Sequence, residues 1–328
     1  MRRRVFNGPL QRPVGLTGSA SLLILCLSVL SLMMMPTRLL AQTTKTTLAA
    51  PTLFAIQIGA TAPVQIQRYE GGEPVSTAVV TYQAEFPLPF KSPGPIQYRD
   101  IVFDYLPIPG VALNTVLTDV LSGNIQPLLG AIVSMDSLKK ELSRLTFQDA
   151  FVRSIEFSDM DVALTGQMPV IRIALAVPHT ATLPGSNQVI TYNAALKGPV
   201  KSSFQLSIQN LEAGLQRSMR VEPLRLAVPI DSQAVQPTGR ADYSNLIAII
   251  PESDAAPFIA WQQQFISQGV INQFEKAGTL NWLSSDRTKT FLSLQLHNLG
   301  VLSVTRIPNR PGYVAVDMYC EKVVPQVF

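Results

Sequence analysis

Hydrophobic and polar residues alternate along much of this chain, and alternation at period two predicts half-buried β-strands. At 54–58 the apolar Phe54, Ile56 and Ile58 share one side and Gln57 lies on the other. The same alternation, or enrichment in Val, Ile, Thr and Tyr, predicts further strands at residues 64–67, 75–86, 98–105, 150–157, 170–177, 204–208, 224–229, 243–250, 291–296 and 313–320. The pattern therefore predicts a mainly β protein, of the α+β kind.

Apolar residues change to helical spacing in three places. They do so at 113–121, in a second short run at 137–145, and after Ser253, whose position suits a helix N-cap. The last helix carries three aromatic residues on one face, which we expect to pack against a sheet: Phe258, Trp261 and Phe265.

Three segments of the first half return in the second half in the same order. The pairs are Phe54–Ile58 with Phe204–Ile208, Pro93–Ile101 with Thr238–Leu246, and Ser154–Val162 with Ser293–Val301. The separations of 150, 145 and 139 residues are nearly constant, and a period this long indicates tandem domains rather than a solenoid. On this alignment Tyr98 is equivalent to Tyr243, and Ile155 to Leu294.

The duplication predicts two β-sandwich or barrel modules, each with one principal flanking helix. Their expected spans are 42–183 and 201–328, with a linker at 184–200. The Pro-Gly-Ser run within Thr180–Asn187 is the strongest linker signal.

Residues 1–41 have the pattern of a signal peptide. Arginines at 2–4 open the segment, an apolar run follows at 22–35, and Ala41 offers a small residue for cleavage. We therefore expect the mature chain to begin near Gln42 and to be exported to the periplasm, the envelope or the medium.

The alternative is a membrane anchor. Residues 15–35 are just long enough to span a bilayer if they are not cleaved. A lipid anchor on Cys26 is disfavoured, because the bulky Leu25 precedes it.

The leader changes how the charge of the chain is interpreted. The full sequence has 26 Lys and Arg against 22 Asp and Glu; without the arginines of 1–41 the basic residues fall to 21, and the net charge becomes about −1. No argument for nucleic-acid binding remains. Cys320 is then the one cysteine left, so an intramolecular disulfide is excluded. Hydrophobic residues reach 47%, which fits either large cores or surfaces covered by partner subunits.

Candidate catalytic groups are sparse. His179 and His297 have no partners at the spacing of a nucleophile or metal site, and we interpret both as ordinary surface histidines. Asp159 and Asp161 could share one side of a strand and bind a cation or do acid–base work. The aligned residues of the second module are Asn298 and Gly300, so a turn-forming role is favoured.

The remaining candidates also favour structure over chemistry. Residues Glu70–Glu73 read as a hairpin turn, and Trp261 and Trp282 as core residues. The sequence therefore predicts no catalytic, cofactor-binding or metal-binding residue, and a protein that is not an enzyme.

At the two tyrosine segments the chain resembles the tail tube proteins of contractile phage tails and related injection machines. In that family a Pro-Gly turn leads to a Tyr-x-Asn-Ile strand, followed by a Trp-bearing helix and a strand ending in an Asn-containing turn. The matching segments are Tyr69–Gly72, Pro93–Gly94, Tyr98–Ile101, Tyr243–Leu246, Trp261, Asn298–Leu299 and Val314–Glu321. The first module lacks the Trp, the second lacks the Glu-Gly-Gly turn, and tube subunits carry no export signal.

The resemblance implies small β-sandwiches or barrels that assemble edge to edge into rings. Three duplicated chains would then give six modules with pseudo-sixfold symmetry, and ring closure would use up exposed sheet edges. The implied function is a structural protein that forms or docks onto a ring or tube. The alternative is an exported envelope binding or adhesion protein with two β-domains.

Overall fold

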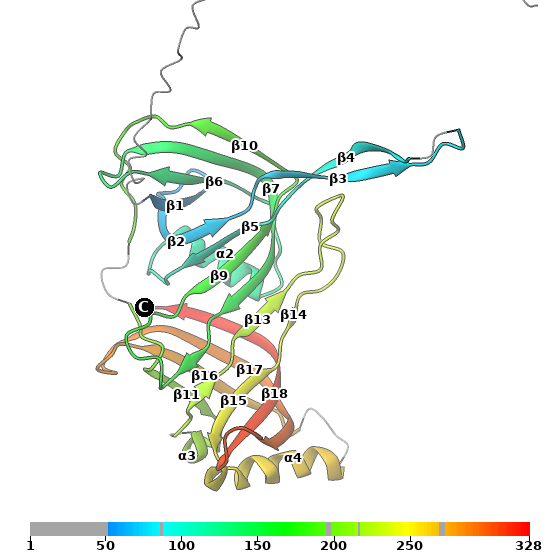
Figure 1. Ribbon diagram of the computed structural model, residues 1–328. Helices are drawn as coiled ribbons and strands as arrows, with labels where there is room; N and C mark the ends of the chain where they lie inside the picture. Colours follow the sequence, from blue (N-terminus) through cyan, green and yellow to red (C-terminus); the bar gives the residue numbers. More distant parts are fainter. Residues whose placement is uncertain (1–51, 86–87, 195–197, 216, 269–272) are drawn as a thin grey trace, which may run out of the picture. The chain divides into compact units, whose positions relative to one another are not determined.

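The computed structural model describes residues 52–85, 88–194, 198–215, 217–268 and 273–328, which form one compact unit. Strands dominate this part of the chain, and the mainly β prediction is confirmed (Figure 1). The predicted leader lies outside the described residues.

Six antiparallel strands of the first half form a closed β-barrel, which we call the first ring. Its members are β1 (Leu53–Ile58), β6 (Leu128–Met135), β7 (Glu141–Phe157), β9 (Ile171–Ala176), β5 (Ile101–Tyr105) and β2 (Val64–Glu70), in that order. The ring closes because β2 pairs with β1. The long strand β7 also pairs with β10 (His179–Pro184) and with β13 (Leu224–Ala227), which carries β14 (Asp242–Tyr243) on its far side.

A second antiparallel sheet repeats this strand order and, in the part of the chain that the structure describes, does not close. It runs β11 (Phe204–Ile208), β16 (Lys276–Leu283), β17 (Thr290–Arg306), β18 (Tyr313–Val327), β15 (Leu246–Pro251), β12 (Arg220–Val221) and β8 (Met160–Asp161). The strands from β11 to β12 follow the same order as β1, β6, β7, β9, β5 and β2 in the first ring. The edges of the second sheet are β11 and β8.

Each sheet contains a bulge at the same place, and these bulges show which residues of the two sheets correspond. Gly130 on β6 faces Phe147 on β7, and Gly278 on β16 faces Leu296 on β17. Just past each glycine the ladder shifts, and Asp149 and Asn298 adopt left-handed backbone angles, φ 50° and 55°. Asx residues tolerate this region well. The two long strands thus correspond at a separation of 149 residues.

This register corrects one predicted equivalence. Ile155 pairs with Ile173, as Val304 pairs with Val316, so its counterpart is Val304 and not Leu294. The prediction was wrong because it aligned Asn298 with Asp159, whereas the residue at the same bulge is Asp149. Tyr98 and Tyr243 each end a strand three residues before β5 and β15 begin, but their strands pair differently, β4 with β3 and β14 with β13.

Two predicted helices are confirmed. Helix α2 (Ala112–Leu121) buries four apolar residues, and α4 (Ala256–Gln268) packs against β17. Phe258 and Trp261 are buried and Phe265 is partly buried against the core, as predicted. Helix α4 starts later than Ser253 because Glu252–Asp254 form a 3-10 turn, η1. A short helix, α3 (Glu212–Leu215), was not predicted.

The helical prediction for 137–145 is wrong. Asp136 accepts the backbone N–H groups of Leu138 and Lys140 in a turn, and β7 begins at Glu141. The leucines that imitate a helical stripe, Leu138 and Leu142, are exposed. The prediction for Thr180–Asn187 also changes, because β10 takes up the first half of that segment.

Residues 90–97, for which the sequence predicted no element, belong to a hairpin. Strands β3 (Pro74–Thr81) and β4 (Phe90–Tyr98) pair only with each other among the described residues. Gly71 and Gly72 are therefore not a hairpin turn, since β2 and β3 do not pair. They are the point where the chain leaves the ring; a Cβ on Gly71 would lie 1.8 Å from the carbonyl oxygen of Asp100.

The two sheets share one hydrophobic core. A single buried cluster includes residues of both, and the rings of Phe157 and Trp282 meet edge to face with centroids 6.2 Å apart. Strands are also exchanged, since β13 follows β12 in the chain but joins the first sheet. Among the described residues, no helix combines the length and apolar character needed to span a bilayer.

Candidate functional site

The hairpin β3–β4 is the most exposed regular element and projects away from the ring (Figure 1). Tyr82 and Leu88, beside its turn, are 81% and 76% exposed. Other large apolar residues of the hairpin are also exposed, namely Val79, Val80, Phe90 and Ile96. Isolated exposed apolar residues are ordinary, but such a concentration on one projecting element indicates an interaction surface.

The two strands of the hairpin differ in what they can bind. Strand β4 contains Pro93 and Pro95, which lack the N–H group that a further strand would need. Strand β3 has Pro74 only at its first position and is rich in Val and Thr. The free edge of β3 is therefore open to pairing, whereas β4 is protected against it.

Side chains at its base fix the hairpin to the ring. Arg153 pairs with Asp100 at 2.5 Å, and the Tyr98 and His179 rings meet with centroids 5.2 Å apart. A cavity of about 590 Å³ lies here, lined by both strands and by loop residues Ser232–Val235. The hairpin thus has a held base and an exposed end.

A row of alternating charges crosses the outer face of the first sheet. Arg68, Asp104, Arg172, Glu156 and Arg225 occupy facing positions on β2, β5, β9, β7 and β13. The Asp104 carboxylate accepts hydrogen bonds from Arg68 Nε at 2.6 Å and Arg172 Nε at 2.8 Å. Because β13 belongs to the second half, the row of facing charges extends across strands of both halves, and its ion pairs are those of Asp104 with Arg68 and Arg172.

These arginines stabilise the ionised form of Asp104. Burial alone would raise its pKa, but the hydrogen bonds and charges of Arg172 and Arg68 outweigh burial and hold the pKa below its usual value. The hydrogen bond to Asp104 raises the pKa of Arg172 in turn. Both groups are therefore ionised and paired at neutral pH.

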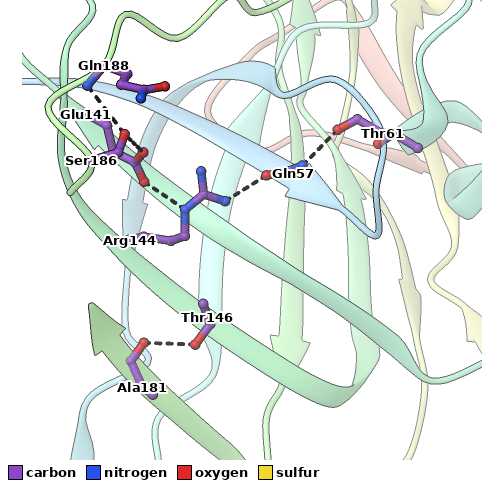
Figure 2. A network of polar contacts seen from close by, with 8 residues as sticks. All are labelled: Gln57, Thr61, Glu141, Arg144, Thr146, Ala181, Ser186 and Gln188. Carbon is purple, nitrogen blue, oxygen red and sulfur yellow. Dashed lines mark hydrogen bonds and ion pairs between the residues drawn. The ribbon is translucent and has the colours of Figure 1, made fainter. Parts of the chain in front are cut away.

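A second polar network ties β7 to β1 and to residues 186–188 (Figure 2). Arg144 donates from Nε to Glu141 Oε1 and from Nη1 to Gln57 Oε1, both at 2.7 Å. Ser186 Oγ donates to the other Glu141 oxygen at 2.7 Å. Burial favours a higher pKa for Glu141, but these donors lower it overall. Both carboxylate oxygens are engaged, so we interpret the network as structural.

The two predicted carboxylate candidates are held apart by different partners. Asp159 pairs with Lys201 Nζ at 2.6 Å and with Arg220. Asp161 is buried on β8 and accepts the N–H of Ala163 at 2.8 Å, which is turn chemistry as favoured from the sequence. The structure gives them no shared ligand-binding geometry.

The other predicted residues lie in structural positions. His179 is exposed at the start of β10; His297 lies within β17, not at the strand end expected for it, because β17 continues through the bulge at Asn298. Trp261 is buried and donates to the carbonyl oxygen of Phe274 at 2.7 Å. Trp282 is fully buried. Over the described residues, no group of three His, Cys, Asp or Glu side chains could hold a metal ion.

The sequence predicted a strand at 75–86, where β3 lies, but it did not predict the partner strand β4 or the charged row. The prolines of 87–95 concealed a strand that pairs outside the main sheets. The charged row joins strands far apart in sequence, so its only local signal was one charged residue on the polar side of each strand.

Comparisons with known proteins give little to identify the chain. No protein-family model and no curated protein matches it. Among solved structures, a chain from the sixfold-symmetrised baseplate of the anti-feeding prophage is similar, with 15% identity over 42% of this chain and 94% of that chain, and a TM-score of 0.35. A chain from the cap that terminates the tube of the same prophage is 18% identical over 40% of this chain and 87% of that one, with a TM-score of 0.33. Likeness at this level carries no argument about function.

Proposed function

We propose that this protein is a non-enzymatic structural subunit that assembles with copies of itself, or with other components, into a ring or tube of a phage-tail-like apparatus. The observation that carries the proposal is the hairpin β3–β4, which exposes Tyr82, Leu88 and four further large apolar side chains. Contact with a second subunit would remove this surface from water.

The common strand order of the two sheets supports assembly by symmetry. Two similar units in one chain allow three chains to close a ring with pseudo-sixfold symmetry. Tyr98 and Tyr243, the residues through which the sequence resembles tail tube proteins, precede β5 and β15 at the same distance.

We further propose that the chain acts outside the cytoplasm, because residues 1–41 have the pattern of an export signal. Mass spectrometry of protein from its native host tests this. A chain starting near Gln42 supports cleavage, and a full-length chain in membranes supports the anchor. A full-length chain in the soluble cytoplasmic fraction contradicts export.

The assembly proposal is tested by exchanging the apolar residues at the hairpin end. The double variant Tyr82→Ser with Leu88→Ser should lower the mass of the assembled protein in light scattering, while its unfolding temperature stays close to wild type because both side chains are exposed. Ile266→Ser, on the exposed side of α4, is the matched control.

Wild-type protein that is monomeric at all concentrations would overturn assembly with copies of itself and favour the binding or adhesion alternative. A hairpin variant that assembles as well as wild type would exclude the hairpin as the contact.

A further inference from the structure

Strand β11 is an edge strand in a place where its counterpart is paired. In the first ring, β1 lies between β6 and β2. In the second sheet, β11 pairs with β16 alone among the described residues, and β12 is only two residues long. Over the residues that the structure describes, the second sheet therefore lacks the pairing that closes the first.

The backbone direction of β11 identifies the groups left at this edge. The carbonyl of Ser203 and the N–H of Gln209 bond to Leu283 and Ala277, at the two ends of β16. Because successive residues of a strand point to opposite neighbours, Phe204 and Leu206 direct their backbone groups away from β16. The carbonyl of Phe204 is capped by Arg287 Nη2 at 2.6 Å. The N–H and C=O of Leu206 face no strand within the described residues.

A cavity of about 860 Å³ lies along this edge. On one side are Phe204, Gln205 and Leu206 of β11, and on the other Val162 and Met219, next to β8 and β12. We call this the β11 slot. Phe204 and Leu206 of this lining are buried, whereas Val162 and Met219 are partly exposed. The slot therefore offers an extended chain the strand edge, some apolar surface and two arginines.

The charge of the slot is positive. Arg217 and Arg287 line it, together with polar and apolar residues and no carboxylate. Arg217 is paired with Asp254. Arg287 has no carboxylate partner in the described part of the chain, and its own backbone is left-handed, with φ 60°.

The same chain carries a strand that suits such an edge. Strand β3 has one free edge, a backbone N–H at every residue after Pro74, and no charged residue. The hairpin turn that follows carries the exposed Glu85, which is opposite in charge to Arg287. Strand addition of this kind draws affinity from main-chain hydrogen bonds.

We propose that β3 of one copy of this protein pairs with β11 of a second copy through the β11 slot, supplying the pairing that β2 provides in the first ring. This proposal rests on the proposed structural function and names the partner surface of the hairpin. The contact joins two different surfaces, so it can extend from copy to copy and close into a ring.

Disulfide trapping between two full-length variants tests the pairing, with Cys26 replaced by Ser and the buried Cys320 kept in both. One chain carries a cysteine at Thr77, Ala78, Val79 or Val80 in turn, so that both faces and several registers of β3 are sampled. The other carries Gln205→Cys. Gln295→Cys, exposed on β17, is the control. A disulfide forms readily only when the two Cα atoms come within about 7 Å.

We expect a linked two-chain product with Gln205→Cys and little with Gln295→Cys. An assembled protein that yields no product, or equal amounts with both, would overturn the β3–β11 pairing and leave the structural function standing. A protein that never self-associates would overturn both this pairing and the self-assembly on which it rests.

Charge reversal gives an independent readout. Glu85→Lys and Arg287→Glu should each weaken self-association by about tenfold, and the two together should restore it. Arg310→Glu, in the exposed loop after β17, is the matched control and should change nothing. Failure of the double variant to recover, with both single variants folded, would contradict the contact between Glu85 and the slot.

Discussion

The beginnings of the two halves differ more than any other matched regions of the molecule. After Ile58 the left-handed Gly59 and the bond from Thr61 Oγ1 to the Ile58 carbonyl form a tight turn, and β2 returns beside β1. After Ile208 the chain enters α3 instead, and the short β12 pairs with β15 and β8 but, among the described residues, not with β11. A single local helix thus separates a closed ring from an open sheet, although the order of the remaining strands is the same.

The outer faces of the two halves differ as well. Arg68 on β2 and Arg220 on β12 occupy matching positions, but the first faces Asp104 and the second faces Ile249. Arg220 finds carboxylates in Asp159 and Glu222 instead. The same strand order therefore places an ion-paired Asp104 on β5 and an apolar Ile249 at the matching position on β15.

The largest expected effect concerns the contact that joins the halves. Trp282→Ala should destabilise the protein by about 3–5 kcal/mol, because it empties a fully buried site against Phe157. Chemical unfolding should still show one transition, shifted to lower denaturant, since the two sheets share a core. Ile266→Ala, on an exposed side chain, is the control. Two separate transitions in the wild-type protein would contradict a shared core.

The next prediction compares the two bulge glycines. A Cβ on Gly130 would lie 2.2 Å from the Gln57 carbonyl oxygen and 2.8 Å from the Phe147 ring. On Gly278 the nearest atoms are at 2.8 Å and 2.9 Å. Both alanine variants should lose stability, on the scale of about 1–3 kcal/mol for overpacking, and Gly130→Ala should lose more. A larger loss for Gly278→Ala in thermal unfolding would contradict the comparison.

A smaller effect is expected from the charged row. Asp104→Asn should cost about 1–2 kcal/mol at neutral pH, because two charged hydrogen bonds are weakened and both arginines are partly exposed. The pKa of Asp104 is lower in the folded than in the unfolded protein, so its contribution is present above about pH 4 and is lost as the pH falls further. Unfolding measured against pH should show this loss in wild type, and a smaller one in Asp104→Asn. Equal losses would contradict the assignment.

The sequence predicted the strands and helices that pack one face against the core better than the turns, the hairpin and the fully apolar strands. Alternation located β1, β9 and β11, and helical spacing located α2 and α4, because each element buries one face against the core. The 137–145 run was misread because Leu138 and Leu142, which imitate a helical stripe, are exposed, and a turn lies at Asp136–Lys140. Strand β6 was missed: its only polar residue is Ser134, so it shows little alternation.

The interaction surface was harder to predict for a physical reason. Strands β3 and β4 bury almost nothing, so burial left no periodic pattern in their sequence. The edge of β11 is open because no strand pairs with it among the described residues, and the absence of a neighbouring strand does not change the sequence pattern of β11 itself. The sequence also contains the alignment that the register of the strands supports. Asp149 with Asn298 and Val152 with Val301 share one separation, but the sequence analysis matched Asp159 with Asn298 instead.

The central claim is that the second half repeats the first and leaves β11 open for a partner. Hydrogen exchange at single amides tests it most directly, by comparing Ile56, whose N–H faces β2, with Leu206, which holds the matching place on β11. In monomeric protein at low concentration we predict strong protection for Ile56 and fast exchange for Leu206, with Leu206 becoming protected on assembly. Equal protection of both amides in the monomer would contradict the claim, because the second sheet would then be closed without a partner.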